Sequence, residues 1–446
     1  MKVTRQFYYK WIYLIVLTGL AFYLRFWFIS HIATQQLFDF ATYQEIAKNI
    51  FLHHQHSLRG QPIAWQGMGY STMLGLFYIM MGNARVETAQ LLNAILSCLS
   101  LPLMYLVFRK LSSSSGAVLG AYTLVALLPN YIAYNNVVGT EVFITLLFLI
   151  ILVLQLYPFD GRIRYPLIGI FIGLAALTKP YFLAYPLVAA AYMWLHSKDV
   201  RQTALLLLGS SLLMMIVIAP WTLHNYRNFG SIIPVSYNSG YVLYVNNNDK
   251  NVNGAWMPLD QVPASKELAS QIKRELAINQ NDVKLAPGLD KLLKPAAFEW
   301  ISQHPAQFLQ LGVLRITTTF FSGAQDIGAW TMNDMQKTEL QKKSSRINRN
   351  INFFFALADI VVYLLCSCGI LYMILNIKVM IKRLFSRRGL LSAEILIPSL
   401  NTAFFAVVYF VFEGQPRYNY PLLFLFAISL TIMMQKTNAA LQRSQA

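Results

Sequence analysis

Apolar segments long enough to cross a lipid bilayer recur along most of this 446-residue chain. A helix needs about 20 mainly apolar residues to span the hydrocarbon core. Hydrophobic residues make up 56% of the chain and charged residues 12%, which is unlike a soluble globular protein. We therefore predict an all-α, polytopic membrane protein with about ten transmembrane helices, in a range of roughly 9 to 13. The predicted spans are 11–31, 86–108, 114–135, 138–157, 165–179, 180–197, 203–220, 354–376, 393–412 and 418–435.

Basic residues assign the two sides of the membrane, because cytoplasmic loops carry an excess of lysine and arginine. With these spans, the basic loop residues fall on one face together with both termini, so that face is predicted to be cytoplasmic. The net charge of +17 is thereby attributed to membrane orientation and not to nucleic-acid binding. The residues are Lys2, Arg5, Lys10, Arg109, Lys110, Arg162, Arg164, Lys198, Arg201, Lys378, Lys382, Arg383, Arg387, Arg388 and Lys436.

The longer connections gather on the opposite face, at 32–85, 135–141, 221–353 and 413–421. The cytoplasmic loops are too short for a nucleotide-binding domain. We therefore expect an active site on the extracytoplasmic side of the cytoplasmic (inner) membrane. The predicted parts of the chain are a transmembrane module with its first outer loop (1–220), an extracytoplasmic segment (221–353) and C-terminal transmembrane helices (354–446).

The outer segments contain helical patterns of their own. Tyr43, Ile46, Ala47, Ile50 and Phe51 repeat with helical spacing, which predicts an amphipathic helix at the membrane surface. The run at 69–82 is too short to cross and predicts a second interfacial helix. The stretch SKELASQIKRELAINQ predicts helix in a small extracytoplasmic cap, whereas GYVLYV at 240–245 resembles a strand.

The stretch PWTLHNYRNFGSIIPVSYNSGYVLYVNNND, residues 220–249, has a recognisable pattern. It resembles the bacterial branch of the dolichyl-phosphate-mannose-protein mannosyltransferase-like family, whose members are GT-C fold glycosyltransferases. The aminoarabinose transferases that modify lipid A belong to the same group. The matching residues are Pro220, Trp221, Asn225, Gly230, Gly240, Asn247 and Asn248, with His224 where arginine is usual.

Five further stretches resemble this family in the same order. Asp39 with Tyr43 resembles its first-loop acid, and GTEVFITLL, which contains Glu141, resembles the Ser-Glu opening of its fourth span. GMGYSTML lacks the prolines of the family's P-P-x-Y-P-x-L segment. GLAALTKP has Lys179 in place of an arginine, and QPRYNYPLL, which contains Arg417, is similar to its C-terminal R-Y-x-x-P.

The resemblance implies an inverting transfer of a sugar from a polyprenyl-phosphate-linked donor. The acceptor would be a protein, a lipid or a cell-wall glycan, and membrane lipids would surround the enzyme. No cofactor is implied. Because no DxD pair occurs, we also expect a mechanism without a metal. The cysteines, Cys98, Cys366 and Cys368, fall in predicted spans and are expected to be free thiols.

Asp39 is the candidate general base. An acceptor hydroxyl loses its proton as it attacks the anomeric carbon, and a positioned carboxylate can accept that proton. The alternative is structural, because an acid near a helix N-terminus is stabilised by the helix dipole. Thr42 and Glu45 are expected to form a capping box, which would leave Asp39 just outside the helix.

Three more charged residues are candidates for substrate binding. Glu141 either lines the cavity or only stabilises the start of a helix. Lys179 and Arg417 lie at the outer ends of predicted spans, where they either hold the donor phosphate or extend to lipid headgroups. Arg25 has the same two interpretations, and the intramembrane acid Asp359 is a functional candidate by default.

The remaining substrate-binding candidates are Tyr43, Tyr70, Tyr418, His224 and Asn247. Tyr43 and Tyr70 could stack on a sugar ring, with anchoring at the membrane interface as the alternative. Tyr418 belongs to the C-terminal motif. His224 could contact phosphate or be structural, and Asn247 could bind substrate or only form a turn.

Two other classes of function remain open for this sequence. A secondary transporter or a flippase for lipid-linked sugars would typically show paired repeats and polar residues near the membrane midplane. The sequence has no internal repeat, and its unusual polar residues gather at the outer rim. The third possibility is an inactive GT-C-like protein that serves in assembly.

Overall fold

The computed structural model describes residues 2–334, 345–386 and 389–445, so Arg387 and Arg388 of the basic set lie outside the described residues. Seven described helices are long and apolar enough to cross a membrane, and the chain is a multi-pass membrane protein. They lie within α1 (Lys2–His31), α4 (Val86–Leu111), α8 (Gly161–Thr178), α10 (Val200–Phe229), α15 (Ser345–Leu384), α16 (Ala393–Val411) and the η7–α17 pair (Pro416–Leu422 and Leu423–Gln445).

Among the described residues, fewer helices are long and apolar enough to cross a membrane than the ten spans predicted. Helix α5 (Ser115–Leu127) and the pair α6 (Pro129–Ala133) and η1 (Tyr134–Asn136) meet at 45° and make an eighth span if counted as one. The spans predicted at 138–157 and 180–197 correspond to helices of 17 and 13 residues, α7 (Thr140–Leu156) and α9 (Tyr185–Ser197). A 17-residue helix is only about 25 Å long, which is shorter than the hydrocarbon core.

Helix α7 forms the centre of the bundle. Nearly all of its residues are buried, and it packs against α4 on one side and α8 on the other. A helix that is apolar all round is stable only when it is enclosed in this way. Its N-terminus, which carries Glu141, therefore starts inside the protein and not at a lipid-facing surface.

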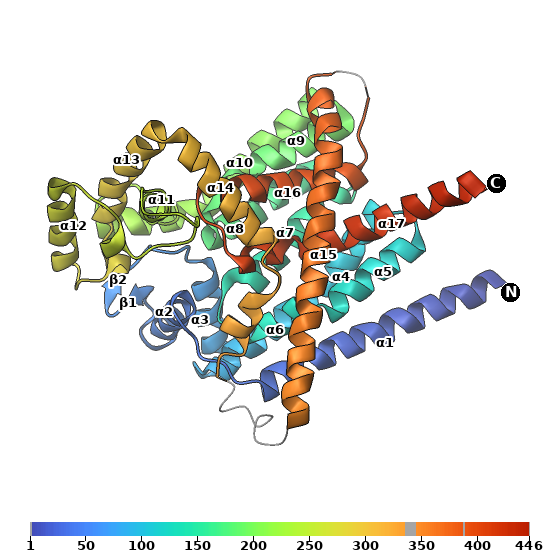
Figure 1. Ribbon diagram of the computed structural model, residues 1–446, viewed down its shortest axis with the longest axis horizontal. Coiled ribbons are helices and arrows are strands. Elements are labelled where there is room, and N and C mark those ends of the chain that lie inside the picture. The colour runs from blue at the N-terminus through green and yellow to red at the C-terminus, as the bar shows by residue number, and fades with distance from the viewer. Residues whose placement is uncertain (1, 335–344, 387–388, 446) are drawn as a thin grey trace.

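The outer elements lie together at the end of the molecule opposite the two termini (Figure 1). The first outer loop contains α2 (Asp39–His53), the hairpin β1 (Ser57–Leu58) and β2 (Gln61–Pro62), and α3 (Gly69–Met81). The later segment contains α11 (Ser239–Asn246), η3 (Leu259–Gln261), α12 (Lys266–Ile278), η4 (Val283–Leu285), α13 (Gly288–Gln303), α14 (Pro305–Phe320) and the π-helical turn η5 (Ile327–Thr331). That these connections share one face of the membrane stays a prediction.

Both helices predicted in the first outer loop are present. Tyr43, Ile46 and Ala47 are buried, and α2 packs closely on α3. A Cβ atom at Gly75 would lie 2.7 Å from Ile50, so the glycine permits this close approach. The apolar stripe of α2 is thus covered by protein.

Two local predictions were wrong. Helix α2 begins at Asp39, and Thr42 donates a hydrogen bond to the carbonyl of Phe38 (3.2 Å) instead of capping a later start. The carboxylate of Glu45 accepts from the backbone N–H of Arg59 (3.2 Å), so no capping box forms. The strand-like run GYVLYV is helix α11, because a short apolar run does not distinguish strand from helix by its period.

The GMG segment before α3 sits directly against the C-terminal end of α8. A Cβ atom at Gly67 would collide with the carbonyl oxygens of Leu177 and Thr178, the two residues before Lys179. The glycines therefore occur where no side chain fits. They allow the first outer loop to pack on the turn that presents Lys179.

We expect Gly67→Ala to destabilise the purified protein by about 1–3 kcal/mol, because overpacking against backbone atoms forces the backbone to shift. Gly19→Ala in α1 is the matched control, since a Cβ atom there meets nothing within 4 Å. Thermal unfolding in detergent measures both variants. Equal stability of the two would show that the contact between the GMG segment and α8 is loose.

Candidate functional site

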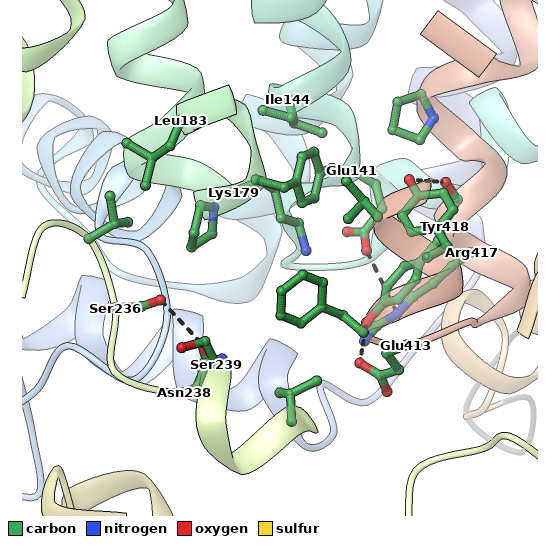
Figure 2. Close-up of a pocket in the computed structure, with 18 of the residues that line it drawn as sticks. Glu141, Ile144, Lys179, Leu183, Ser236, Asn238, Ser239, Glu413, Arg417 and Tyr418 are labelled. Carbon is green, nitrogen blue, oxygen red and sulfur yellow. Dashed lines mark hydrogen bonds and ion pairs between the residues drawn. The ribbon is translucent and has the colours of Figure 1, made fainter. Parts of the chain in front are cut away.

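A cavity of about 350 Å³ lies where the outer ends of several helices meet. Apolar side chains line much of it, among them those of Ile144, Leu183, Val242 and Val408. Figure 2 shows charged side chains on one side of the cavity and a small group of polar side chains on the opposite side. The charged residues are Glu141, Lys179, Glu413 and Arg417, and the polar residues opposite are Ser236, Asn238 and Ser239.

Arg417 connects the acids of this site. Its guanidinium lies 3.7 Å from a carboxylate oxygen of Asp39 and 3.8 Å from one of Glu141. It also donates a hydrogen bond to Gln415 (2.8 Å). The aromatic rings of Phe40, Trp330 and Tyr418 surround it, with centroids 4.8, 5.7 and 5.6 Å from the guanidinium carbon. Arg417 is therefore fixed between two carboxylates that come from different helices.

Glu141 stands in the first turn of α7 and has only 6% of its side chain exposed. One carboxylate oxygen faces Arg417, and the other, Oε2, is buried without a hydrogen-bond partner among the described residues. A buried carboxylate oxygen without a partner is costly. Because Glu141 lines the cavity, a bound molecule could supply the missing donor.

Lys179 follows the last residue of α8 and also lines the cavity. Its ammonium lies 5.6 Å from the centroid of the Tyr418 ring. Among the described side chains, none forms a hydrogen bond or an ion pair with it. Burial lowers the pKa of Lys179, and the carboxylate of Glu141 opposes that shift. A cation in this setting suits an anionic ligand.

Asp39 begins α2 and lies beside the cavity, with 39% of its side chain exposed. Its two carboxylate oxygens face different cations. Oδ2 lies 3.7 Å from Arg417, and Oδ1 lies 3.6 Å from the ammonium of Lys284 in η4. The candidate base therefore pairs with one cation that lines the cavity and with a second cation from the extracytoplasmic segment.

The predicted tyrosines support the site in different ways. Tyr418 lines the cavity, and its hydroxyl donates to Glu413 (2.9 Å). Tyr43 packs edge-to-face on Tyr70 at 5.7 Å between ring centroids, and the Tyr70 hydroxyl donates to Asn93 (3.0 Å). Burial, with the carboxylate of Asp39 as a smaller cause, raises the pKa of Tyr43 well above its ordinary value. Tyr43 and Tyr70 thus pack against each other near Asp39 and do not line the cavity.

His224 and Asn247 also do not line the cavity. The His224 ring stacks on Trp221 at 4.9 Å. Asn247 donates to the carbonyl of Leu243 (2.8 Å) and accepts from the guanidinium of Arg315 (2.8 Å). The predicted roles of His224 and Asn247 in substrate binding stay predictions. A pattern of matching residues cannot distinguish a packing role from a binding role.

Arg25 and Asp359 have structural partners. The Arg25 guanidinium is buried and donates to Ser97 (2.8 Å) and to the carbonyls of Ala21 and Ala126. Asp359 accepts from the backbone N–H of Ala324 (2.6 Å), and so ties α15 to the loop before η5. Neither residue lines the cavity. The cysteines are free thiols, as predicted.

The sequence did not indicate three acidic or basic residues near the site, Glu413, Lys284 and Asp326. Glu413 lies two residues before the QPRYNYPLL stretch and had no partner in the sequence pattern. Asp326 accepts a short hydrogen bond from the Tyr134 hydroxyl, and burial raises its pKa to about 6. Lys284 is one lysine of several in a polar segment. Only contacts between distant segments distinguish it.

No group of three or more His, Cys, Asp or Glu residues that could hold a metal ion occurs among the described residues. Two acids of the site, Asp39 and Glu141, are instead joined through the Arg417 guanidinium. Whether the reaction depends on a metal stays a prediction from the sequence.

No protein-family model matches the chain, and no curated protein does. The solved oligosaccharyltransferase AglB from Archaeoglobus fulgidus, in complex with an inhibitory peptide and a dolichol-phosphate, matches with a TM-score of 0.51 at 14% identity. That match covers 98% of this chain and 52% of AglB. AglB tethered to an acceptor peptide containing the NVT sequon gives a TM-score of 0.52 at 13% identity, over 98% and 51% of the two chains. This chain has the GT-C fold.

The matches to AglB confirm the GT-C fold that the sequence motifs predicted. ArnT from Cupriavidus metallidurans, solved with undecaprenyl phosphate, is 14% identical over 97% of this chain and 80% of ArnT, with a TM-score of 0.42. At these identities the likeness establishes the fold alone. The chain spans about half the length of AglB.

We expect Arg417→Gln to destabilise the protein by about 3 kcal/mol, because removing one partner of a buried ion pair leaves the other charge unpaired. Arg417 has 9% of its side chain exposed and Glu141 has 6%. The double variant Arg417→Gln/Glu141→Gln should recover part of that loss. Thermal unfolding of the single and double variants measures both effects, and full additivity of the two changes would contradict the pairing.

Proposed function

We propose that this chain is a membrane glycosyltransferase that uses a polyprenyl-phosphate-linked sugar as its donor. One observation carries the proposal. The ammonium of Lys179, which has no anionic partner among the described residues, lies at a partly apolar cavity, beside the Arg417 guanidinium, which lies between two carboxylates. That combination fits a ligand with a lipid tail, a phosphate and a sugar.

The donor phosphate would bind between Lys179 and Arg417. Lys179 supplies a point charge, and Arg417 offers two parallel N–H groups that suit phosphate oxygens. The lipid would lie along the apolar side chains that line the cavity, including Ile144, Leu183 and Val408. AglB, which shares the fold, was solved with a dolichol-phosphate, and we include a lipid phosphate in the proposal on that ground as well.

The reaction would be a single displacement with inversion at the anomeric carbon. The acceptor hydroxyl oxygen forms a bond to that carbon, its proton passes to the carboxylate of Asp39, and the bond from the carbon to the phosphate oxygen breaks. The polyprenyl phosphate leaves with one more negative charge. Lys179 and Arg417 lie where they would stabilise this developing charge. The acceptor would be a protein, a lipid or a cell-wall glycan.

Transfer would take place on the extracytoplasmic side of the cytoplasmic membrane. Two arguments support this side. The basic residues of the short loops mark the opposite face as cytoplasmic. The charged wall is also built from outer helix ends, at the start of α7, after α8 and before α17. This position at the rim is less typical of a transporter, whose binding site lies near the bilayer midplane.

We expect Asp39→Asn to lower the rate of sugar transfer by about 10²- to 10⁴-fold, because the amide cannot accept the proton. The assay uses purified protein with cell-lipid extracts that carry radiolabelled polyprenyl-phosphate sugars. Glu45→Gln is the matched control, since Glu45 lies on the same helix and contacts the backbone of Arg59.

Equal transfer by wild type and Asp39→Asn would assign Asp39 to the start of α2 only. No transfer by the wild type with any acceptor would reject the enzyme in favour of a flippase or an inactive assembly protein. Binding of the lipid-linked sugar would then distinguish those two functions.

We expect Lys179→Met to weaken donor binding roughly 10- to 100-fold, the value of one lost charge-assisted hydrogen bond. Lys179→Arg should keep most of the affinity, because it retains the positive charge at the same place. The dissociation constant of a polyprenyl phosphate without a sugar measures the effect apart from catalysis. Unchanged affinity in Lys179→Met would mean that the phosphate binds elsewhere.

A further inference from the structure

One lysine of the extracytoplasmic segment, Lys284, forms an ion pair with the candidate base Asp39. The ammonium of Lys284 lies 3.6 Å from Oδ1 of Asp39 and donates a hydrogen bond to the hydroxyl of Thr42 (2.6 Å). Asp39 and Thr42 are three residues apart in the first turn of α2 and so lie on one face of the helix. Lys284 belongs to η4 and lies 242 positions after Thr42 in the chain.

Other contacts hold Lys284 in place independently of Asp39. Its backbone N–H donates to Asp282 (2.9 Å), and its carbonyl accepts from the hydroxyl of Tyr237 (2.8 Å). Asp282 forms an ion pair with Arg59 of the first outer loop (3.1 Å). These contacts fix the backbone of η4 against the first outer loop. The ammonium is therefore presented to Asp39 by the fold and is not a flexible surface charge, and its side chain is only 22% exposed.

The two oxygens of Asp39 consequently have separate environments. Oδ2 faces Arg417, which lines the cavity proposed for the donor. Oδ1 faces Lys284, which does not line that cavity. Each cation stabilises the ionised carboxylate, which is the form that accepts a proton. Arg417 also pairs with Glu141. The ammonium of Lys284, in contrast, contacts only the first turn of α2 among the described residues.

We propose that Lys284 is a positioning residue for Asp39: it orients the carboxylate for proton transfer, so that the extracytoplasmic segment affects the rate of sugar transfer through the geometry of the base. This inference rests on the proposed function. Lys284 touches neither the donor cavity nor the reacting atoms, and it acts through Asp39. The extracytoplasmic segment is thereby part of the active site and not only a cover over it.

The test compares kcat and the Michaelis constant for the donor in wild type, Lys284→Met and Lys284→Arg. Without the ammonium, the carboxylate of Asp39 loses one of its two cationic contacts, and kcat should fall roughly 10- to 100-fold because the base is misplaced. The Michaelis constant for the donor should stay unchanged, because Lys284 does not line the donor cavity. Lys284→Arg should restore most of kcat.

Lys291→Met is the matched control. Lys291 lies in the same segment, and its ammonium donates to Ser231 (2.6 Å). A merely structural effect would reduce thermal stability or raise the Michaelis constant, and Lys284→Arg would not rescue it. If Lys284→Met does not fold, Lys284→Gln serves in its place, because its amide is polar but carries no charge.

The outcomes separate this inference from the proposed function. Transfer by wild type, with an equal kcat in Lys284→Met, would overturn the role of Lys284 and leave the enzyme intact. An equal loss of kcat in Lys291→Met would also overturn it, because a general change in surface charge would then be the cause. A wild type without any transfer would reject the proposed function itself.

Discussion

The arrangement of the outer helix ends depends on one guanidinium. Arg417 pairs with Asp39 from α2 and with Glu141 from α7, and three aromatic rings surround it. Two carboxylates this close to one another would repel each other without a cation between them. The apolar surroundings strengthen every charge interaction, since little water screens it. The first outer loop, the central helix and the C-terminal region are thus joined at a single point.

The position of this charge cluster follows from where helices end. Short α7 starts inside the protein, and α8 stops just before Lys179. A helix that ends within the bundle brings polar residues into an apolar environment, where they need partners. Arg417, Asp39 and Glu141 pair with one another, whereas Lys179 and Oε2 of Glu141 have no hydrogen-bond or ionic partner among the described residues. This incomplete pairing is the reason for our proposal that the cavity binds an anionic ligand.

The extracytoplasmic segment contributes a second cation from the opposite direction. Lys284 and Arg417 come from different parts of the chain and approach different oxygens of Asp39. The segment is anchored to the first outer loop through Arg59 and Asp282. Folding of the segment and formation of the site are therefore coupled, because the same contacts that fix η4 also place the ammonium of Lys284.

The sequence by itself determined the class of protein and most of its elements. Runs of apolar residues specify membrane helices because the bilayer requires their length and composition. Six short motifs indicated the GT-C fold, and four of them contain Asp39, Glu141, Lys179 and Arg417, which the structure brings to one region. These residues were detectable because a motif records residue type at fixed spacing.

Only the tertiary structure decided which predicted residues meet. His224 and Asn247 belong to the motifs, but packing against Trp221 and Arg315 occupies them away from the cavity. Lys284 belongs to no motif, and it reaches Asp39 because η4 folds against the first outer loop. The conformation of GYVLYV, which is helical, and the residue at which α2 starts likewise depend on the tertiary structure. Contacts between distant segments leave no periodic trace in the sequence, so local patterns could not reveal them.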